Sequence, residues 1–168
     1  MFIDETCLNT KMVRLYGRSP RGTRCLGQCP HGHWGTSTFI AALRWDRLDA
    51  PLLVDGPMDG IIFLAYVEQV LAPCLRPGNV VVCDNLSCHK VQGVREAIEA
   101  QGAQIRYLPP YSPDLNPIEM AFSKLKTWMR KIAARDFDHL CGGVGLALSQ
   151  FTPSDCRNYF RHANYATI

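Results

Sequence analysis

Residues 107–135 read YLPPYSPDLNPIEMAFSKLKTWMRKIAAR, and this stretch decides how the rest of the chain is organised. It predicts the end of a strand, a rigid proline loop and then a helix. Asn116 is a good N-cap, and Pro117 suits the first helical position because its missing N–H would have no partner there. The apolar residues that recur at helical spacing and should bury one face of this helix are Ile118, Phe122, Leu125, Met129 and Ile132.

Glu119 falls in the first turn of the predicted helix. Prolines at positions 109, 110, 113 and 117 restrict φ along the loop, so this carboxylate should be held rigidly relative to the preceding strand. Taken alone, such an acid is explained by the positive end of the helix, which it stabilises slightly. Two further acids, Asp4 and Asp84, suggest a different role.

The composition describes one globular domain with a substantial core, since the chain has 168 residues of which 47% are hydrophobic. Its longest apolar run, residues 61–67, is too short to span a membrane. The N-terminal sequence MFIDETC lacks the basic and apolar regions of a signal peptide. We therefore expect a soluble, cytoplasmic (nucleoid-associated) protein without a membrane partner.

The eight cysteines do not indicate a disulfide framework, because nothing in the sequence indicates secretion. Cys83 and Cys141 are expected to be buried thiols. One segment is rich in zinc-type ligands but lacks two separated ligand pairs, which disfavours zinc there: Cys25, Cys29, His31 and His33.

Positive charge is concentrated near the N-terminus, although the formal net charge is only +3. Residues 6–45 contain no acid and six basic residues: Lys11, Arg14, Arg18, Arg21, Arg24 and Arg44. Such a segment suits a polyanionic partner, and a solvated basic arm explains it equally well. Both interpretations stay open at this point.

The order of the predicted elements is that of the α/β ribonuclease H-like fold, a mixed sheet flanked by helices. Strands are expected at residues 2–7, 24–29, 36–43, 79–84 and 103–108, with a short extension at 52–54. Helices are expected at residues 60–72, 90–101, 117–135 and 138–150 and from residue 153, the first capped by Asp59 and ended by Pro73. Residues 1–135 would form the catalytic domain, and residues 136–168 a helical extension of the same domain.

Three acids occupy key places in this order: Asp4 in the first strand, Asp84 at the end of the fourth, and Glu119 at the start of a helix. The first and fourth strands are neighbours in a ribonuclease H-like sheet, so the three carboxylates should converge. Divalent cations relieve the repulsion within such a group. Two Mg²⁺ ions about 3.5–4 Å apart would stabilise an in-line phosphoryl displacement. Each acid on its own also suits a structural role at an element end.

Three motifs resemble those of DDE transposases of the mariner superfamily, and within it the bacterial insertion sequence 630 branch. They are IDET at 3–6, DNLSCHK at 84–90 and LPPYSPDLNPIE at 108–119. The second and third acids are separated by the 34 residues 85–118, which is the spacing of that group. Further matches, such as YGRSPRG, PHGHW, TFIAALR and AYVEQVLAP, extend the resemblance over nearly the whole chain.

This resemblance implies that Asp4, Asp84 and Glu119 hold two Mg²⁺ or Mn²⁺ ions. They would cleave DNA at an element end and join the freed 3′-hydroxyl to target DNA, typically at a TA step. Asn85 would lie beside the metals. Residues expected to contact DNA are Arg14, Arg18, Arg21, Arg24, His89, Lys90, Lys124 and Lys126. For His89, Lys90 and the helix lysines, capping or a solvated face is an equally good explanation.

Members of that family carry N-terminal helix-turn-helix domains that recognise the inverted repeats. The sequence shows no such domain. The start at Met1 suggests a split gene with an upstream-encoded helix-turn-helix segment, or a truncated element. The active form would be a homodimer or larger. An alternative is a non-catalytic remnant that binds DNA or a full-length transposase. Matches outside the three acids argue against a stand-alone ribonuclease H-like nuclease.

Overall fold

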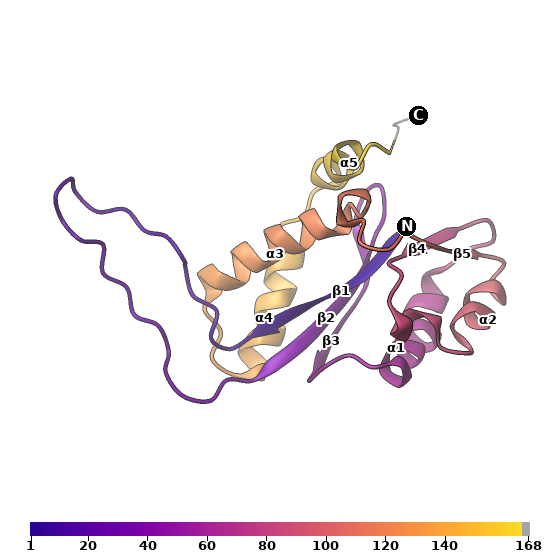
Figure 1. Cartoon of the computed structure of the whole chain (residues 1–168), viewed down its shortest axis with the longest axis horizontal. Helices are drawn as coiled ribbons and strands as arrows, with labels where there is room; N and C mark the ends of the chain where they lie inside the picture. The colour runs from indigo at the N-terminus through magenta and orange to yellow at the C-terminus, as the bar shows by residue number, and fades with distance from the viewer. Residues whose placement is uncertain (166–168) are drawn as a thin grey trace.

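The computed structural model describes residues 1–165, and its five strands form one mixed sheet in the order β3-β2-β1-β4-β5 (Figure 1). The strands are β1 (Phe2–Asn9), β2 (Thr36–Leu43), β3 (Leu48–Asp55), β4 (Val80–Cys83) and β5 (Gln104–Tyr107). β2 runs antiparallel to both of its neighbours, β1 and β3, whereas β4 runs parallel to β1 and to β5. This is the mixed sheet that the element order predicted.

Helices cover both faces of the sheet (Figure 1). They are α1 (Gly60–Tyr66), α2 (Val94–Glu99), α3 (Ile118–Ile132), α4 (Phe137–Leu148) and α5 (Pro153–His162). α1 begins at its predicted cap, Asp59, and continues through a π-helical segment, η1 (Val67–Leu71), into a 3₁₀ turn, η2 (Ala72–Cys74). No helix among residues 1–165 is both long and apolar enough to cross a membrane.

Two apolar cores, one on each face, hold these layers together. α3, α4 and α5 cover the core on one face, in which Phe39 of β2 packs edge-on against Phe122 of α3. α1 and α2 cover the other core, which includes Ile3, Phe63 and Tyr66. Full burial of each large side chain stabilises the fold by about 1.5–3 kcal/mol, so both layers are firmly attached.

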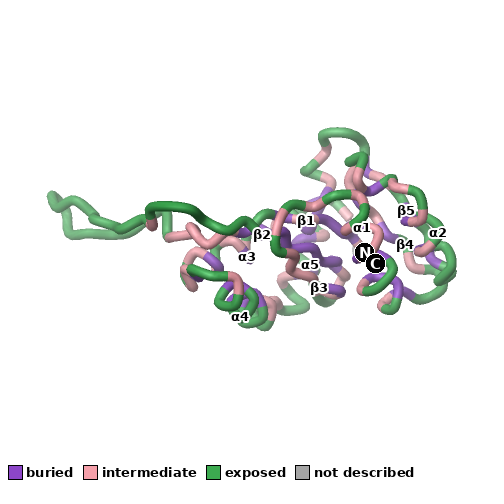
Figure 2. Tube along the Cα trace, turned by 90° about the horizontal axis from the view of Figure 1, so that it is seen from below, coloured by how far each residue is buried: buried purple, intermediate pink, exposed green. Residues whose placement is uncertain are grey.

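The predicted strand at residues 24–29 is wrong. Residues 10–35, which we call the arm, form no helix or strand and extend away from the domain (Figure 2). Only Leu26 is a large apolar residue in 24–29, and it is 83% exposed, so a strand there would have no face to bury. The third strand is instead β3, of which only residues 52–54 were predicted. Pro51 argued against a strand in the sequence, because proline cannot donate a hydrogen bond to a neighbouring strand. β3 lies at the edge of the sheet, where this proline is tolerated.

Two smaller expectations also fail. The helix predicted at residues 90–101 begins only at Val94, because Gly93 adopts a φ of 99° and separates α2 from the 3₁₀ turn η3 (Ser87–Lys90). Cys83 is buried as predicted, but Cys141 is exposed because α4 turns its neighbour Leu140 toward the core.

Candidate active site

Two neighbouring strands bring the first two acids together. β1 and β4 run parallel with Phe2 opposite Val82, so the same register continued by two residues aligns Asp4 with Asp84. Asp4 lies within β1, and Asp84 directly follows β4. The parallel register of the two strands therefore places both carboxylates side by side, at the point where β4 ends.

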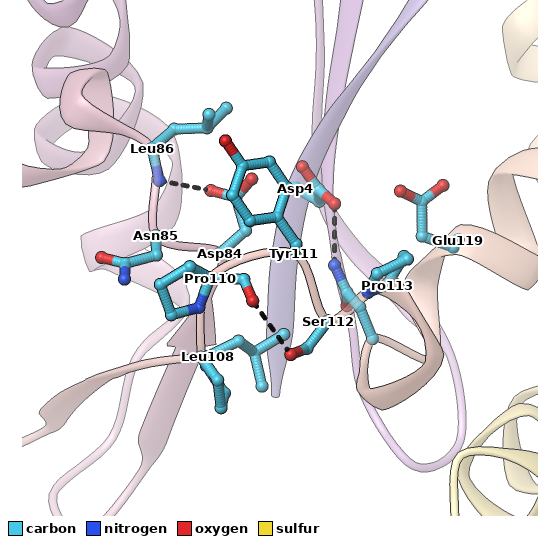
Figure 3. Close-up of a pocket in the computed structure, with 12 residues that line it drawn as sticks. Asp4, Asp84, Asn85, Leu86, Leu108, Pro110, Tyr111, Ser112, Pro113 and Glu119 are labelled. Carbon is cyan, nitrogen blue, oxygen red and sulfur yellow. Dashed lines mark hydrogen bonds between the residues drawn. The ribbon is translucent and has the colours of Figure 1, made fainter.

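The proline loop brings the third acid to the same place. It leaves β5, makes one 3₁₀ turn, η4 (Pro113–Leu115), and leads into α3, whose second residue is Glu119. Asp4, Asp84 and Glu119 line a single cleft of about 320 Å³ (Figure 3). The three acids singled out in the sequence therefore meet in space, although they come from three different elements.

Asn116 does not cap α3 through its side chain. The helix begins at Ile118 without a side-chain cap, and the Asn116 Nδ2 atom instead donates a 2.7 Å hydrogen bond to Asp4 Oδ2. The backbone oxygen of Asn116 accepts a 3.2 Å hydrogen bond from the N–H of Glu119. Asn116, which is buried, therefore ties Asp4 to the start of the helix that carries Glu119. Its good capping chemistry concealed this role in the sequence.

Asp4 is strongly affected by its surroundings. Burial raises the pKa of its carboxyl from 3.8 to about 7; a hydrogen bond from the backbone N–H of Glu5 opposes this shift. The negative charges of Glu5, Asp84 and Glu119 raise this pKa further. No lysine or arginine is among the described residues that line the cleft.

The donor set of the cleft fits divalent cations. Mg²⁺ and Mn²⁺ prefer carboxylate, carbonyl and water oxygens, and Asp4, Asp84 and Glu119 offer carboxylates in one cleft. In addition, the buried Asn116 Oδ1 atom has no hydrogen-bond partner within residues 1–165. The three carboxylates could therefore hold a metal centre, whose charge would offset their repulsion.

His89 lies behind the cleft, and the prediction that it contacts DNA is wrong. Its side chain is completely buried, and its ring centroid lies 4.3 Å from that of Phe63. His89 Nε2 is hydrogen-bonded to Glu5 Oε2 at 2.9 Å. His89 Nδ1 lies 2.6 Å from Asp84 Oδ1, a close contact between the two groups that does not count as a hydrogen bond. The buried His89 ring therefore restricts the position of the Asp84 carboxylate from the protein interior.

The charge of His89 depends on these acids. Burial favours the neutral ring, but the hydrogen bond and the charge of Glu5 outweigh it, with help from Asp84 and Asp4, and the pKa of His89 is raised. The sequence did contain a signal for this arrangement: Asp4 and Glu5 are consecutive in a strand, so they point to opposite faces. Asp4 is buried on one face and Glu5 is half-buried on the other, so each acid requires a partner on its own face.

The predicted DNA-binding lysines have different environments. Lys90 is exposed, and its Nζ atom lies 5.5 Å from the centre of the Tyr107 ring. Lys124 instead donates 2.8 Å hydrogen bonds from Nζ to Asp155 Oδ2 and to the backbone oxygen of Gln150. The charge of Lys124 is thus engaged within the protein, and its contact with DNA stays a prediction.

The four predicted DNA-binding arginines all lie on the arm and are all exposed: Arg14, Arg18, Arg21 and Arg24. The arm is attached at its base, where Thr10 N–H donates a 3.1 Å hydrogen bond to Gly35 O and Arg135 Nη1 donates one of 3.0 Å to Thr10 O. Beside this base, Lys126 and Arg130 of α3 share a groove with Lys11 of the arm. The cysteine- and histidine-rich segment lies farther along the arm, where Cys25 and Cys29 are exposed free thiols.

A protein-family comparison covers most of the chain. The model of a family described as DDE superfamily endonuclease matches residues 1–141. No curated protein matches the sequence.

Solved structures share the fold at low sequence identity. The chain superposes on the Mos1 transposase paired-end complex with left transposon end with a TM-score of 0.73, at 11% identity, covering 96% of this chain and 51% of that one. For the Mos1 mariner paired end complex with Mn, the TM-score is 0.64 at 13% identity, covering 97% and 51%. For the catalytic domain of Mos1 mariner transposase, it is 0.61 at 12% identity, covering 97% and 75%.

These likenesses concern the fold, which is the ribonuclease H-like mixed sheet of the Mos1 catalytic domain. The chain spans about half the length of the transposase chains in the two paired-end complexes.

Proposed function

This chain belongs to the DDE superfamily of endonucleases, and we propose that it is the catalytic domain of a transposase that cleaves and joins DNA strands. The observation that carries this proposal is the meeting of Asp4, Asp84 and Glu119 in one cleft without a lysine or arginine. We further propose the insertion sequence 630 group, because the 34 residues 85–118 separate the last two acids.

In the proposed reaction, the three carboxylates hold two Mg²⁺ or Mn²⁺ ions. When bound, these ions supply Lewis-acid stabilisation of the attacking and leaving oxygens of an in-line phosphoryl displacement. A Mos1 paired-end complex with Mn supports the choice of metal. The chain's own residues fix the geometry. Asn116 orients Asp4 through its 2.7 Å hydrogen bond, and the buried His89 ring contacts Asp84 from the protein interior. Water would attack at an element end, and the freed 3′-hydroxyl would attack target DNA at a TA step.

We propose that the arm and the groove beside α3 bind the DNA backbone. Arg14, Arg18, Arg21 and Arg24 are exposed, and Lys126 faces the groove. Lys and Arg side chains supply most of the sequence-independent affinity for phosphates. Recognition of element ends would come from a helix-turn-helix segment encoded upstream, and the active form would be a homodimer in the cytoplasm, at the nucleoid.

We also propose that residues 136–168 extend the domain formed by residues 1–135 rather than forming another. Leu140 and Val144 of α4 and Tyr159 of α5 belong to the same apolar core as Phe122 of α3. Removal of α4 and α5 would expose that core.

The proposal is tested by nicking of supercoiled plasmid that carries the element ends. Wild type and Asp84→Asn are compared in Mg²⁺, in Mn²⁺ and in EDTA, each with and without the upstream-encoded segment. We expect metal-dependent nicking by wild type and its loss in Asp84→Asn. Unchanged nicking by Asp84→Asn would refute the assignment of the three acids.

A requirement for the upstream segment would identify the chain as half of a split enzyme. If folded protein nicks under no condition, the alternative becomes the better explanation, namely a non-catalytic remnant that binds DNA or a full-length transposase. Circular dichroism on each sample establishes that the variant and the wild type are equally folded.

A further inference from the structure

Tyr111 is an unusual residue in the wall of the cleft. It is 101% exposed, although it lies in the same loop that positions α3 and lines the cleft together with Asp4 and Asp84. Figure 3 shows its ring on the side of the cleft where Asp84 and Leu86 lie. A fully exposed ring contributes no packing to the folded chain, so the fold itself does not explain an aromatic residue here.

The backbone conformation of Tyr111 is also unusual. Tyr111 has a φ of 54°, in the left-handed region that glycine and asparagine adopt far more readily than tyrosine. Pro109, Pro110 and Pro113 surround it and restrict the loop. A residue chosen for stability alone would be Asn or Gly. Strained backbone of this kind concentrates at functional sites, where the side chain's position serves a ligand.

A second exposed apolar side chain faces the same cleft. Leu86 is 48% exposed and follows Asp84 by two residues, and its backbone N–H donates a 3.1 Å hydrogen bond to Asp84 Oδ1. The cleft therefore combines carboxylates that suit metal ions with an exposed ring and an exposed aliphatic side chain. Phosphate would be held at the metals, whereas a flat apolar group would be accommodated by Tyr111 and Leu86.

We propose that Tyr111 and Leu86 form a nucleobase subsite, in which the Tyr111 ring stacks on one base of the strand whose phosphate lies at the carboxylates. This inference rests on the proposed function. The base must leave its own stack to meet the ring, so the cleft would take DNA that is locally unpaired or single-stranded. Aromatic stacking accepts every base, because each has a π-face, so the subsite positions the strand without reading its sequence.

The test compares two synthetic probes in Mg²⁺: an oligodeoxythymidylate of twelve nucleotides and the same backbone without bases. We expect wild type to prefer the probe with bases. In Tyr111→Ala this preference should fall about 5- to 150-fold, the range of a single base–aromatic stack. Tyr111→Phe keeps the ring and should keep the preference. Leu86→Ala should reduce it less than Tyr111→Ala does.

Stability measurements give a second, opposite readout. Because Asn adopts the left-handed region more readily than Tyr, Tyr111→Asn should melt at the same temperature as wild type or higher while losing the preference for bases. A lower melting temperature would mean that the ring supports the fold, and would overturn the inference.

An unchanged preference in Tyr111→Ala would also overturn it, as would failure of wild type to distinguish the two probes. None of these outcomes decides the proposed function, which depends on the separate loss of plasmid nicking in Asp84→Asn. Leu146→Ala is the matched control, because Leu146 is 68% exposed on α4 and does not line the cleft. It should change neither readout.

Discussion

The cleft and the arm differ in what holds their residues in place. In the cleft, Asp4 and Asn116 are buried and joined by a 2.7 Å hydrogen bond. The three acids lie within a strand, at the end of a strand and at the start of a helix. Along the arm, every residue from Arg14 to Cys29 is exposed. The two regions therefore suit different tasks. Bond cleavage requires reacting groups placed to within about 1 Å, whereas attraction of a polyanion requires only charge.

The largest effect is expected in the cleft, from Asp4→Asn. Loss of a metal-ligand carboxylate removes several kcal/mol of transition-state stabilisation, so nicking should fall at least about 10³-fold. The folded, metal-free protein should nevertheless become more stable. The pKa of Asp4 is raised from 3.8 to about 7, so its ionisation costs stability that is absent below pH 3.8 and complete above pH 7.

Thermal unfolding in EDTA at pH 5 and pH 8 checks this prediction. The advantage of Asp4→Asn over wild type should be larger at pH 8, on the order of a few kcal/mol. The asparagine keeps an oxygen that can accept the hydrogen bond from Asn116. If Asp4→Asn were stabilised equally at both pH values, ionisation of Asp4 would not cost stability. The cleft would then not differ from the arm in this respect.

The second prediction concerns two histidines that both contact acids. His89 is completely buried against Glu5, whereas the side chain of His139 is 75% exposed beside Asp136. His89→Ala leaves Glu5, whose side chain is only 15% exposed, without its partner and should lower the free energy of unfolding by about 3–5 kcal/mol. His139→Ala should lower it far less, since exposed pairs contribute little.

Urea unfolding at pH 6 measures both variants. The raised pKa of His89 means that its stabilising charge is fully present below the unfolded pKa of 6.5 and is lost as the pH rises through the folded value. The difference between the two variants should therefore shrink in alkaline buffer. Equal losses at pH 6 would contradict the role assigned to His89.

The third prediction tests the arm through salt dependence. A variant with four Arg→Ser changes, at positions 14, 18, 21 and 24, should bind DNA with a salt slope reduced by about 3 to 4, because each phosphate contact contributes about 0.9. Its melting temperature should match wild type, since all four side chains are exposed. Binding is measured by fluorescence anisotropy of a labelled duplex between 50 and 200 mM salt, roughly the range in which such slopes are resolved.

Net charge alone must be separated from position on the arm. A control variant removes the same number of charges from exposed arginines elsewhere: Arg76, Arg106, Arg157 and Arg161. We expect the control to leave most of the salt slope intact. If both variants reduce it equally, the arm has no special part in binding.

The same contrast explains which sequence-based predictions succeeded. Asp4, Asp84 and Glu119 could be placed together because each lies in or beside a strand or helix whose apolar residues are clear in the sequence. Packing of these elements in the core then fixes the three positions. α4 and the capped start of α5 were also predicted near their observed bounds, for the same reason.

Predictions failed where local pattern and packing disagree. Residues 24–29 have no face to bury, so their strand-like composition had no packing to support it. From the sequence, Asn116 was assigned the role of an N-cap and His89 a contact with DNA, and neither was given a partner within the protein. Their partners, Asp4 and Glu5, lie 112 and 84 residues away, and only the fold brings them together.

The smallest effects distinguish two lysines two positions apart on α3. Lys124 pairs with Asp155, whose pKa is lowered to about 2 chiefly by this hydrogen bond, whereas Lys126 lines the groove beside the arm. Lys124→Ala should lower the free energy of unfolding by up to about 1 kcal/mol and leave DNA affinity unchanged. This loss should be present above pH 3.8 and vanish as the pH falls toward 2. Lys126→Ala should do the reverse, leaving stability unchanged and reducing the salt slope of DNA binding by about 1. If Lys124→Ala instead weakened DNA binding as much as Lys126→Ala, the ion pair would open on binding, and α3 would contact DNA with both lysines rather than only with the one beside the arm.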